Sequence, residues 1–237
     1  MNRDKAKVRQ VLDAVKAAGR ASLTAPEGKQ LCDAYGIAVP QEGVATSAAE
    51  AQKLAASMGF PVVMKIVSPD ILHKTEARGV LVGVKSADDA AKGFDTIIAN
   101  AKKHKADAQI VGVQVQQMLK GGQEVIVGAV TDNSFGKLVA FGLGGVLVEV
   151  LKDRRLALAP VDELRARSMV DRLEVRPLLE GVRGQPAADV DALTHAIAAL
   201  SWLAHDLGDH LEALDANPLI CGPNGCVALD ALMILRT

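Results

Sequence analysis

Three oxygen-bearing side chains gather near the C-terminus around a predicted β-turn, and together they could bind a metal ion. The turn is Gly-Pro-Asn-Gly at 222–225, where proline fixes φ, asparagine bonds locally and glycine tolerates positive φ. If the proline and asparagine are the central residues, Asn217 lies opposite Asp230, and strand alternation turns Asp215 to the same face. A one-residue slip of the turn would leave Asp230 on this face, diagonally placed. Two carboxylates and an amide suit Mg²⁺, which usually takes one or two carboxylates plus nucleotide phosphates; a solvated polar hairpin face is the alternative.

Upstream residues have types suited to phosphate chemistry. Lys65 lies within the apolar strand pattern 61–67, where a buried ammonium needs an anion unless it reaches solvent at a strand end. His73 lies in the loop 68–79, which is dense in ionisable groups. A neutral imidazole can attack phosphorus, although a surface histidine is the plainer interpretation. Glu124, at the start of an apolar strand, either pairs with a lysine in a cleft or ends an edge strand in solvent.

The glycine-rich segment 141–146 follows a predicted strand and indicates either a backbone approach to a phosphate or a tight turn. It does not match the dinucleotide pattern G-x-G-x-x-G, because Leu147 occupies the place of the last glycine. Neither Gly-Lys pair, at 28–29 or 136–137, has the remaining P-loop residues. A nucleotide would therefore bind through another architecture.

The composition excludes several classes of protein. The chain has 237 residues, 49% apolar and 23% charged, enough for one large domain or two lobes. A net charge of −1 and an aromatic content of 3% argue against nucleic-acid binding. We expect no membrane span and no secretory signal, because no apolar run is long enough and the N-terminus is charged. Cys32, Cys221 and Cys226 are interpreted as reduced structural thiols of a cytoplasmic protein, because they are too few for a secreted scaffold and poorly spaced for zinc.

The order of predicted elements indicates an α+β protein. Helices are expected at 4–18, 24–36, 47–59, from 86 onward and at 189–205. Strands are expected at 37–39, 61–67, 79–84, 110–118, 124–130, 137–141 and 146–151, followed by the terminal hairpin. Helix–strand alternation thus gives way to a meander, which favours two lobes with a cleft between them.

Several segments, taken in order, resemble the ATP-grasp subunit of ADP-forming acyl-CoA synthetases, relatives of the β subunit of succinyl-CoA synthetase. They are Tyr35–Pro40, Phe60–Pro69, His73–Thr75, Glu124–Gly128, Phe141–Gly145, Val148–Asp153, Leu178–Gly184 and Asp215–Leu219. The resemblance implies an ATP-grasp fold, in which two α+β lobes hold the nucleotide between antiparallel sheets. We therefore expect an N-terminal helix at 1–22, an N-terminal lobe at 23–110 and a C-terminal lobe at 111–237.

The resemblance also implies roles for single residues. Lys65 would contact nucleotide phosphates, and Glu124 matches an acidic strand position in the cleft. Asn217 and Asp230 match the magnesium positions of the family, with Asp215 as an acidic residue beside them.

Two further positions follow from the same resemblance. His73 falls where these synthetases carry a histidine that accepts phosphate close to the nucleotide. Gln117 stands where many ATP-grasp proteins have a glutamate near the adenine, and its amide can still donate and accept hydrogen bonds.

Taken together, the matches imply one half of an acid–CoA ligase. The expected reaction interconverts acyl-CoA, ADP and phosphate with a small carboxylic acid, CoA and ATP through a phosphohistidine, with ATP or ADP and Mg²⁺ on this chain. No CoA-binding Rossmann segment is visible in the sequence, so CoA is expected on a separate α subunit of a heteromer, for which α2β2 is one arrangement. Two alternatives stay open: a non-catalytic nucleotide-binding regulatory module, and a stand-alone ATP-dependent carboxylate ligase.

Overall fold

The computed structural model describes residues 3–145, 153–181 and 186–236, which form two compact units. Unit 1 combines the chain up to Val39 with the chain from Gly121 onward, and unit 2 is the continuous segment Pro40–Lys120. Among the described residues, no helix is long and apolar enough to cross a membrane.

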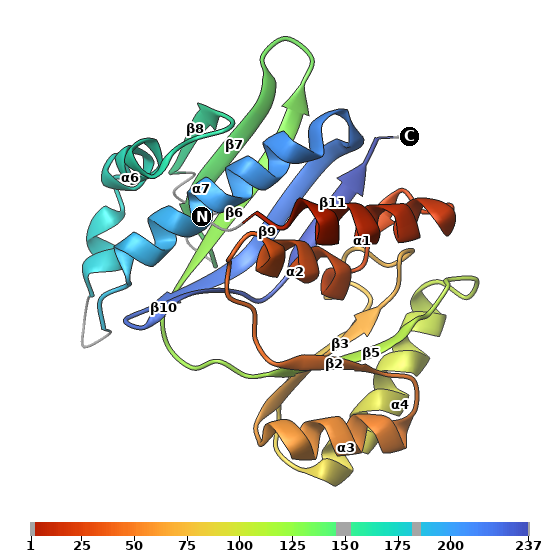
Figure 1. The fold of residues 1–237 in the computed structure, drawn as a ribbon. Coiled ribbons are helices and arrows are strands. Elements are labelled where there is room, and N and C mark those ends of the chain that lie inside the picture. The colour runs from red at the N-terminus through yellow and green to blue at the C-terminus, as the bar shows by residue number, and fades with distance from the viewer. Residues whose placement is uncertain (1–2, 146–152, 182–185, 237) are drawn as a thin grey trace. The chain divides into compact units, whose positions relative to one another are not determined.

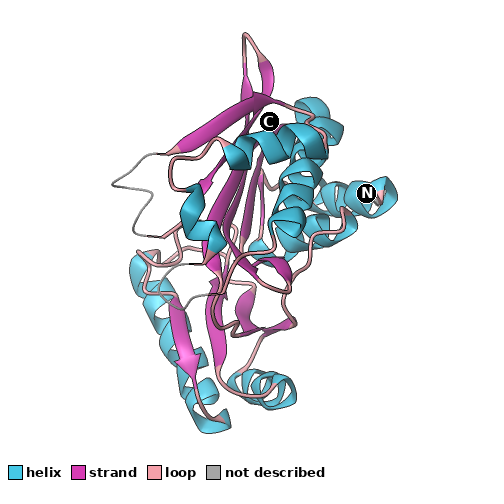
Figure 2. Cartoon of the chain, turned by 90° about the vertical axis from the view of Figure 1, so that its left-hand side faces the viewer, coloured by secondary structure: helices cyan, strands magenta, loops and turns pink. Residues whose placement is uncertain are grey.

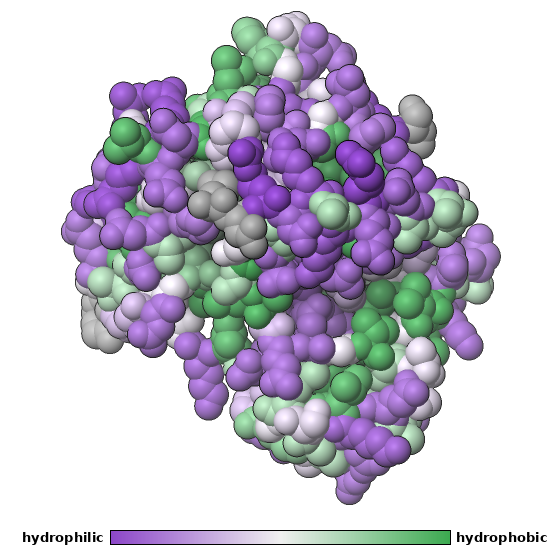
Figure 3. Space-filling view, in the orientation of Figure 1, coloured by the Kyte–Doolittle hydropathy of each residue, from purple (hydrophilic) through white to green (hydrophobic). Residues whose placement is uncertain are grey.

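Unit 1 is built on a seven-stranded antiparallel sheet with the order β1-β11-β9-β6-β7-β8, and β10 pairs with β9. The strands are β1 (Ser22–Leu23), β6 (Gln123–Asp132), β7 (Gly136–Leu143), β8 (Arg154–Leu158), β9 (Leu211–Gly222), β10 (Gly225–Ala228) and β11 (Ala231–Leu235). Near the tip of the β6–β7 hairpin, Val130 and Phe135 are 50% and 69% exposed. Hydrophobic side chains gather at the top of Figure 3, where Figure 1 shows this hairpin.

Helices cover one face of this sheet (Figures 1 and 2). They are α1 (Lys5–Ala17), α2 (Ala25–Ala34), α6 (Glu163–Asp171) and α7 (Val190–Leu207), with short 3₁₀ helices η1 (Arg176–Glu180) and η2 (Gly208–His210). Val125, Val127 and Ala129 of β6 are buried against them, while the alternate residues point the other way. We call this other side of the unit 1 sheet the open face; Val130 and, on β8, Leu156 and Leu158 are exposed there.

Unit 2 is a four-stranded antiparallel sheet with two helices. The order is β2 (Glu42–Ala45), β5 (Gly112–Gln117), β3 (Val62–Val67) and β4 (Val80–Val84), and the helices are α3 (Ala48–Met58) and α4 (Ala87–His104). Met64 and Ile66 share a separate hydrophobic core with residues of both helices. The serine caps begin both helices as their sequence suggests: Ser47 accepts from Glu50 N and Ser86 from Asp89 N.

The predicted lobe boundaries, 1–22, 23–110 and 111–237, differ from the two units. Strand β1 pairs with β11, and α2 packs into the core of unit 1, so the N-terminal segment folds with the C-terminal half. Strand β5 pairs with β2 and β3 and therefore belongs to unit 2. The partners that decide these assignments are distant in sequence, and local patterns do not reveal them. The strand expected at 37–39 is only an isolated bridge, Ala38 to Val227, and the one at 146–151 lies outside the described residues.

The expectation of three reduced thiols is corrected by the structure. Cys221 and Cys226 form a disulfide across the β9–β10 hairpin, with their Cα atoms 4.2 Å apart. The register that pairs Asn217 with Asp230 also sets Cys221 opposite Cys226, which brings the sulfur atoms within bonding reach. Cys32 is a buried free thiol, and burial raises its pKa to about 12.

Candidate functional site

The terminal hairpin has the predicted register. Cys226 pairs with Cys221 and Ala228 with Leu219, and the same register continues into Ala231 opposite Ala216. Asn217 therefore lies opposite Asp230, and its backbone N donates to the Asp230 carbonyl at 3.2 Å. The central turn residues are the proline and asparagine of 222–225, as the sequence indicates.

The side chains of Asp215, Asn217 and Asp230 lie close together on the open face. Burial raises the pKa of Asp215, a hydrogen bond from the Asn217 side chain opposes this shift, and the charge of Asp230 raises the pKa further. The two carboxylates repel each other, and a divalent cation between them would remove this repulsion. With the amide oxygen of Asn217, they form a set of oxygen ligands that suits such a cation. Within the described residues, no group of three or more His, Cys, Asp or Glu side chains forms a metal cluster, so the amide is needed to complete this set.

A pocket of about 230 Å³ opens on the same face of the sheet. Small residues, Gly128, Ala140 and Gly142, form part of its lining together with Ile126. Gly128 pairs directly with Asp215, so the pocket and the carboxylates occupy adjacent strands. Residues at alternate positions of β6 and β7 thus leave a mostly apolar pocket beside Asp215, and Asp153 and Arg154 add charged groups to its lining. In the sequence, this pocket is indicated only by small residues at alternate positions of the strands. Hydrophobic periodicity alone gives such segments a weak strand pattern and does not reveal a pocket.

Glu124 and the glycine-rich turn after β7 are in contact. Gly144 N donates to the Glu124 carbonyl at 2.6 Å, and a Cβ at Gly144 would lie 3.0 Å from the Glu124 Cβ. Gly145 has a φ of +70°, which only glycine adopts readily. The bend at Gly144 and Gly145 thus requires glycine, and the Glu124 side chain is exposed on the open face. Residues 146–152, which follow, lie outside the described residues.

In unit 2, Lys65 on β3 is only 9% exposed, and it pairs with Gln114 of β5 on the face away from the helices. Gln114 Nε2 donates to Glu42 Oε2 at 2.7 Å, while the buried Gln114 Oε1 accepts no hydrogen bond from a described residue. A buried amide oxygen that accepts no hydrogen bond is unusual, and it makes this face suitable for a polar ligand or a water molecule. Sequence reasoning missed Gln114, although its period-two spacing with Gln116 in an apolar strand was visible.

Gln117 lies at the exposed end of β5, opposite Val62. Its backbone N donates to the Gln41 carbonyl at 2.9 Å. Strand alternation places its side chain on the opposite face from Lys65 and Gln114. Its contact with adenine stays a prediction.

His73 is exposed in the loop that follows β3. Ile71 and Ala77, each 3% exposed, anchor this loop in the core of unit 2 on either side of the histidine. The imidazole makes no hydrogen bond or ion pair with another described residue. The imidazole is thus accessible to solvent, while the loop on either side of it is held by buried residues. The loop directly follows the strand that carries Lys65.

The structure therefore groups the sequence-predicted residues by unit. Asp215, Asn217 and Asp230 form one acidic set in unit 1, with Glu124 farther along the same face. Lys65, His73 and Gln117 belong to unit 2.

Comparison with known proteins agrees with this architecture. The sequence model of the ATP-grasp domain family matches residues 14–235 of this chain. The β subunit of acetate–CoA ligase (ADP-forming) II from Pyrococcus furiosus is 40% identical over 229 residues, which cover 96% of this chain and 97% of the relative.

Two solved structures of the dinucleotide-forming acetyl-coenzyme A synthetase 1 of Ca. Korarchaeum cryptofilum have the same fold. One, in complex with coenzyme A, Ca-AMPCP and HgCl⁺, has a TM-score of 0.92 at 37% identity and covers 96% of this chain and 99% of that chain. The other contains coenzyme A and Mg-AMPPCP, with its phosphohistidine segment pointing towards the nucleotide-binding site. It has a TM-score of 0.82 at 35% identity and covers the same shares of both chains, 96% and 99%.

The two antiparallel sheets and the matched domain define an ATP-grasp protein, which confirms the predicted fold. Within that class, the chain belongs to the family of β subunits of ADP-forming acyl-CoA synthetases, because its relative is matched over nearly the full length of both chains.

Proposed function

We propose that this chain is the nucleotide-binding subunit of an acid–CoA ligase, which interconverts acyl-CoA, ADP and phosphate with a carboxylic acid, CoA and ATP. The observation that carries the proposal is the acidic set beside a mostly apolar pocket on the open face of unit 1. A nucleotide needs both a flat apolar surface for its base and oxygen ligands for its metal ion.

The chain's own residues divide these tasks. Asn217 and Asp230, with Asp215 beside them, are the residues that would hold Mg²⁺, which neutralises phosphate charge when bound. Lys65 supplies a second positive charge toward the phosphates. Glu124, exposed on the same face as the acidic set, can accept hydrogen bonds from the nucleotide.

His73 is the proposed acceptor of the γ-phosphoryl group. A neutral ring nitrogen attacks the γ-phosphorus, the bond to the β–γ bridging oxygen breaks, and ADP leaves. The phosphohistidine then gives its phosphoryl group to the carboxylic acid, and the thiol of CoA displaces phosphate from the acyl phosphate. The exposure of His73 supports this role, because the imidazole must meet both its phosphoryl donor and its acceptor.

The remaining sites belong to a partner in this proposal. The similar P. furiosus protein is named a β subunit, which supports a CoA-binding α subunit for this chain as well. An α2β2 heteromer and a cytoplasmic location stay predictions.

The decisive experiment incubates the chain and its partner with γ-labelled ATP and Mg²⁺, and then measures acid-labile phosphate on this chain. His73→Ala is expected to abolish the label, whereas the exposed His104→Ala is the matched control and keeps it. Label that persists in His73→Ala would exclude the relay. Nucleotide binding without any transfer in the wild-type chain would instead favour a regulatory module.

A further inference from the structure

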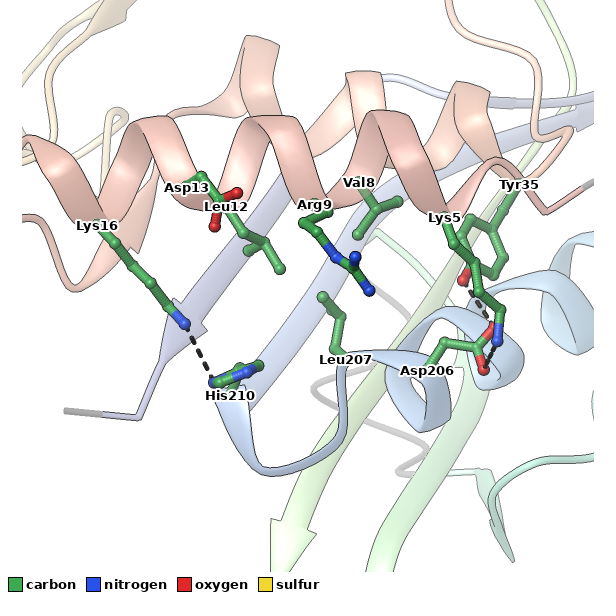
Figure 4. A pocket seen from close by; sticks show the side chains of 10 residues that line it. All are labelled: Lys5, Val8, Arg9, Leu12, Asp13, Lys16, Tyr35, Asp206, Leu207 and His210. Carbon is green, nitrogen blue, oxygen red and sulfur yellow. Dashed lines mark hydrogen bonds and ion pairs between the residues drawn. The ribbon is translucent and has the colours of Figure 1, made fainter.

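A second pocket lies on the helix-covered side of unit 1, between α1 and the C-terminal end of α7 (Figure 4). Its volume is about 280 Å³. None of its lining residues is on the open face of the sheet, and none has a role in the proposed reaction.

The walls of this pocket carry an excess of positive charge. Lys5 is neutralised by Asp206, whose Oδ1 lies 2.8 Å from the Lys5 Nζ. Arg9, by contrast, makes no hydrogen bond or ion pair with any described residue, and in Figure 4 its guanidinium reaches into the space between the two helices. With Lys16 also in the lining, the only remaining carboxylate there is that of Asp13.

Lys16 and His210 form an unusual contact at one end of the pocket. The Lys16 Nζ lies 3.2 Å from the His210 Nδ1, and the ammonium can only act as the donor in this contact. Two basic groups thus meet without an acid between them. Together with Arg9, which lines the same pocket, they favour an anionic ligand there.

The floor of the pocket is apolar. Val8 and Leu12 of α1 and Leu207 of α7 form it, and they are 6%, 7% and 2% exposed. Cations at the rim above buried aliphatic side chains suit a ligand that has one charged end and one short apolar end.

We propose that this pocket binds a small oxyanion, a carboxylate or a phosphate, that carries a short apolar group. The Arg9 guanidinium forms a planar fork that matches two oxygens of such a group, and Lys16 and His210 add their positive and polar groups at one end of the same pocket. The apolar portion lies on Leu12 and Leu207. The bound anion joins α1 to η2, which directly precedes β9, the strand that carries Asp215 and Asn217.

The test follows the imidazole signals of His210 by NMR in the full chain, with the signals assigned through His210→Gln. Butyrate, inorganic phosphate and the neutral amide butyramide are titrated separately. A saturable shift with butyrate, with phosphate or with both supports the site and tells which oxyanion it prefers. The absence of saturation with both, or an equal response to butyramide, overturns the proposal.

Two variants show whether the shift comes from this pocket. Arg9→Gln is expected to weaken binding about tenfold or more, because it removes a charge-assisted pair of hydrogen bonds. Lys7→Gln removes one charge from the same helix, but Lys7 pairs with Asp33 outside the pocket, so binding should change little. Equal affinities in the two variants would show non-specific charge attraction and would also overturn the proposal.

Discussion

Asp215, a residue of the proposed metal site, works against the stability of the metal-free fold. Its carboxylate is partly buried and lies near Asp230, and both facts raise its pKa and disfavour the ionised form. The same crowding makes the position suitable for a divalent cation.

Asp215→Asn should therefore separate the two effects. The variant removes repulsion, so the metal-free chain should unfold at a higher urea concentration at neutral pH than the wild type. Its affinity for Mn²⁺ should fall by at least about tenfold, because substitution of a residue that only hydrogen-bonds a metal ligand already lowers metal affinity by that factor. The exposed Asp107→Asn is the control and should change neither the urea midpoint nor Mn²⁺ binding.

Lys29 is a buried lysine of α2 that contacts the C-terminal hairpin, which carries Asp215, Asn217 and Asp230. It is 1% exposed, and its Nζ donates to the Leu229 carbonyl at 3.4 Å, one residue before Asp230. The preceding Gly28 approaches so closely that a Cβ there would lie 2.4 Å from the Ala231 carbonyl oxygen. Helix α2 is thus fixed directly against this corner of the chain.

Lys29→Ala should lower the free energy of unfolding by about 2–4 kcal/mol, because it leaves a cavity and removes a buried hydrogen bond. Urea denaturation followed by circular dichroism measures this change. Lys53→Ala removes an exposed lysine from α3 and should cost less than about 0.5 kcal/mol. Similar values for the two variants would mean that Lys29 does not hold this corner.

At the scale of elements, the start of α2 depends on an acidic capping residue. Thr24 N and Thr24 Oγ1 each donate to Glu27 Oε2 at 2.8 Å, and Arg20 Nη2 lies 2.6 Å from Glu27 Oε1. Burial raises the pKa of Glu27, but the hydrogen bonds from Arg20 and Thr24 outweigh it and leave the pKa below the ordinary 4.5.

Because the pKa of Glu27 is lower in the folded state, its contribution to stability is present above pH 4.5 and is lost as the pH falls through the folded value. Glu27→Gln should therefore destabilise the chain by about 1 kcal/mol at pH 7. The difference from wild type should close on acidification below pH 4.5. Urea midpoints across this range test it, and the exposed Glu174→Gln should show no such pH-dependent difference.

The open face gives a second prediction at the scale of elements. A Cβ at Gly128 would meet only the Leu214 carbonyl oxygen, at an ordinary 3.4 Å, so Gly128→Val should fold with little loss of stability. Its side chain would fill the pocket beside Asp215, and binding of ADP should weaken severalfold or more by calorimetry. Ala213→Val, two residues from Asp215 on β9 and outside the pocket lining, is the control. Unchanged ADP affinity in Gly128→Val would place the nucleotide elsewhere.

What the sequence could predict follows from the range of the interactions involved. The 222–225 turn, the Thr24 capping box and the facing of Asn217 and Asp230 all rest on neighbours in the chain, and the structure has each of them. The pocket along Gly128 and Ala140 depends on the pairing of two strands, which patterns in one segment indicate only weakly. The Cys221–Cys226 bond lies within the same local hairpin, and it was missed because the thiols were assigned from composition and not from the register.

At the scale of the whole molecule, unit 2 is an insertion in unit 1. Its first and last strands are hydrogen-bonded neighbours, because β2 pairs with β5 and Gln117 N donates to the Gln41 carbonyl. A segment whose ends lie together and whose core is its own has the properties of an independently folding domain. Unit 1, in contrast, needs both ends of the chain.

We therefore expect residues 40–120, expressed alone, to fold and to melt cooperatively by circular dichroism. The isolated segment contains Lys65 and His73 but none of the acidic set, so it should not bind Mn²⁺. The complementary chain, in which a short Gly-Ser linker replaces residues 40–120, should keep its fold and bind Mn²⁺, because Asp215, Asn217 and Asp230 all lie on the hairpin of unit 1. Metal binding by the isolated segment with the affinity of the full chain would show that the acidic set is not the metal site. An unfolded segment would instead show that the core around Met64 and Ile66 depends on unit 1.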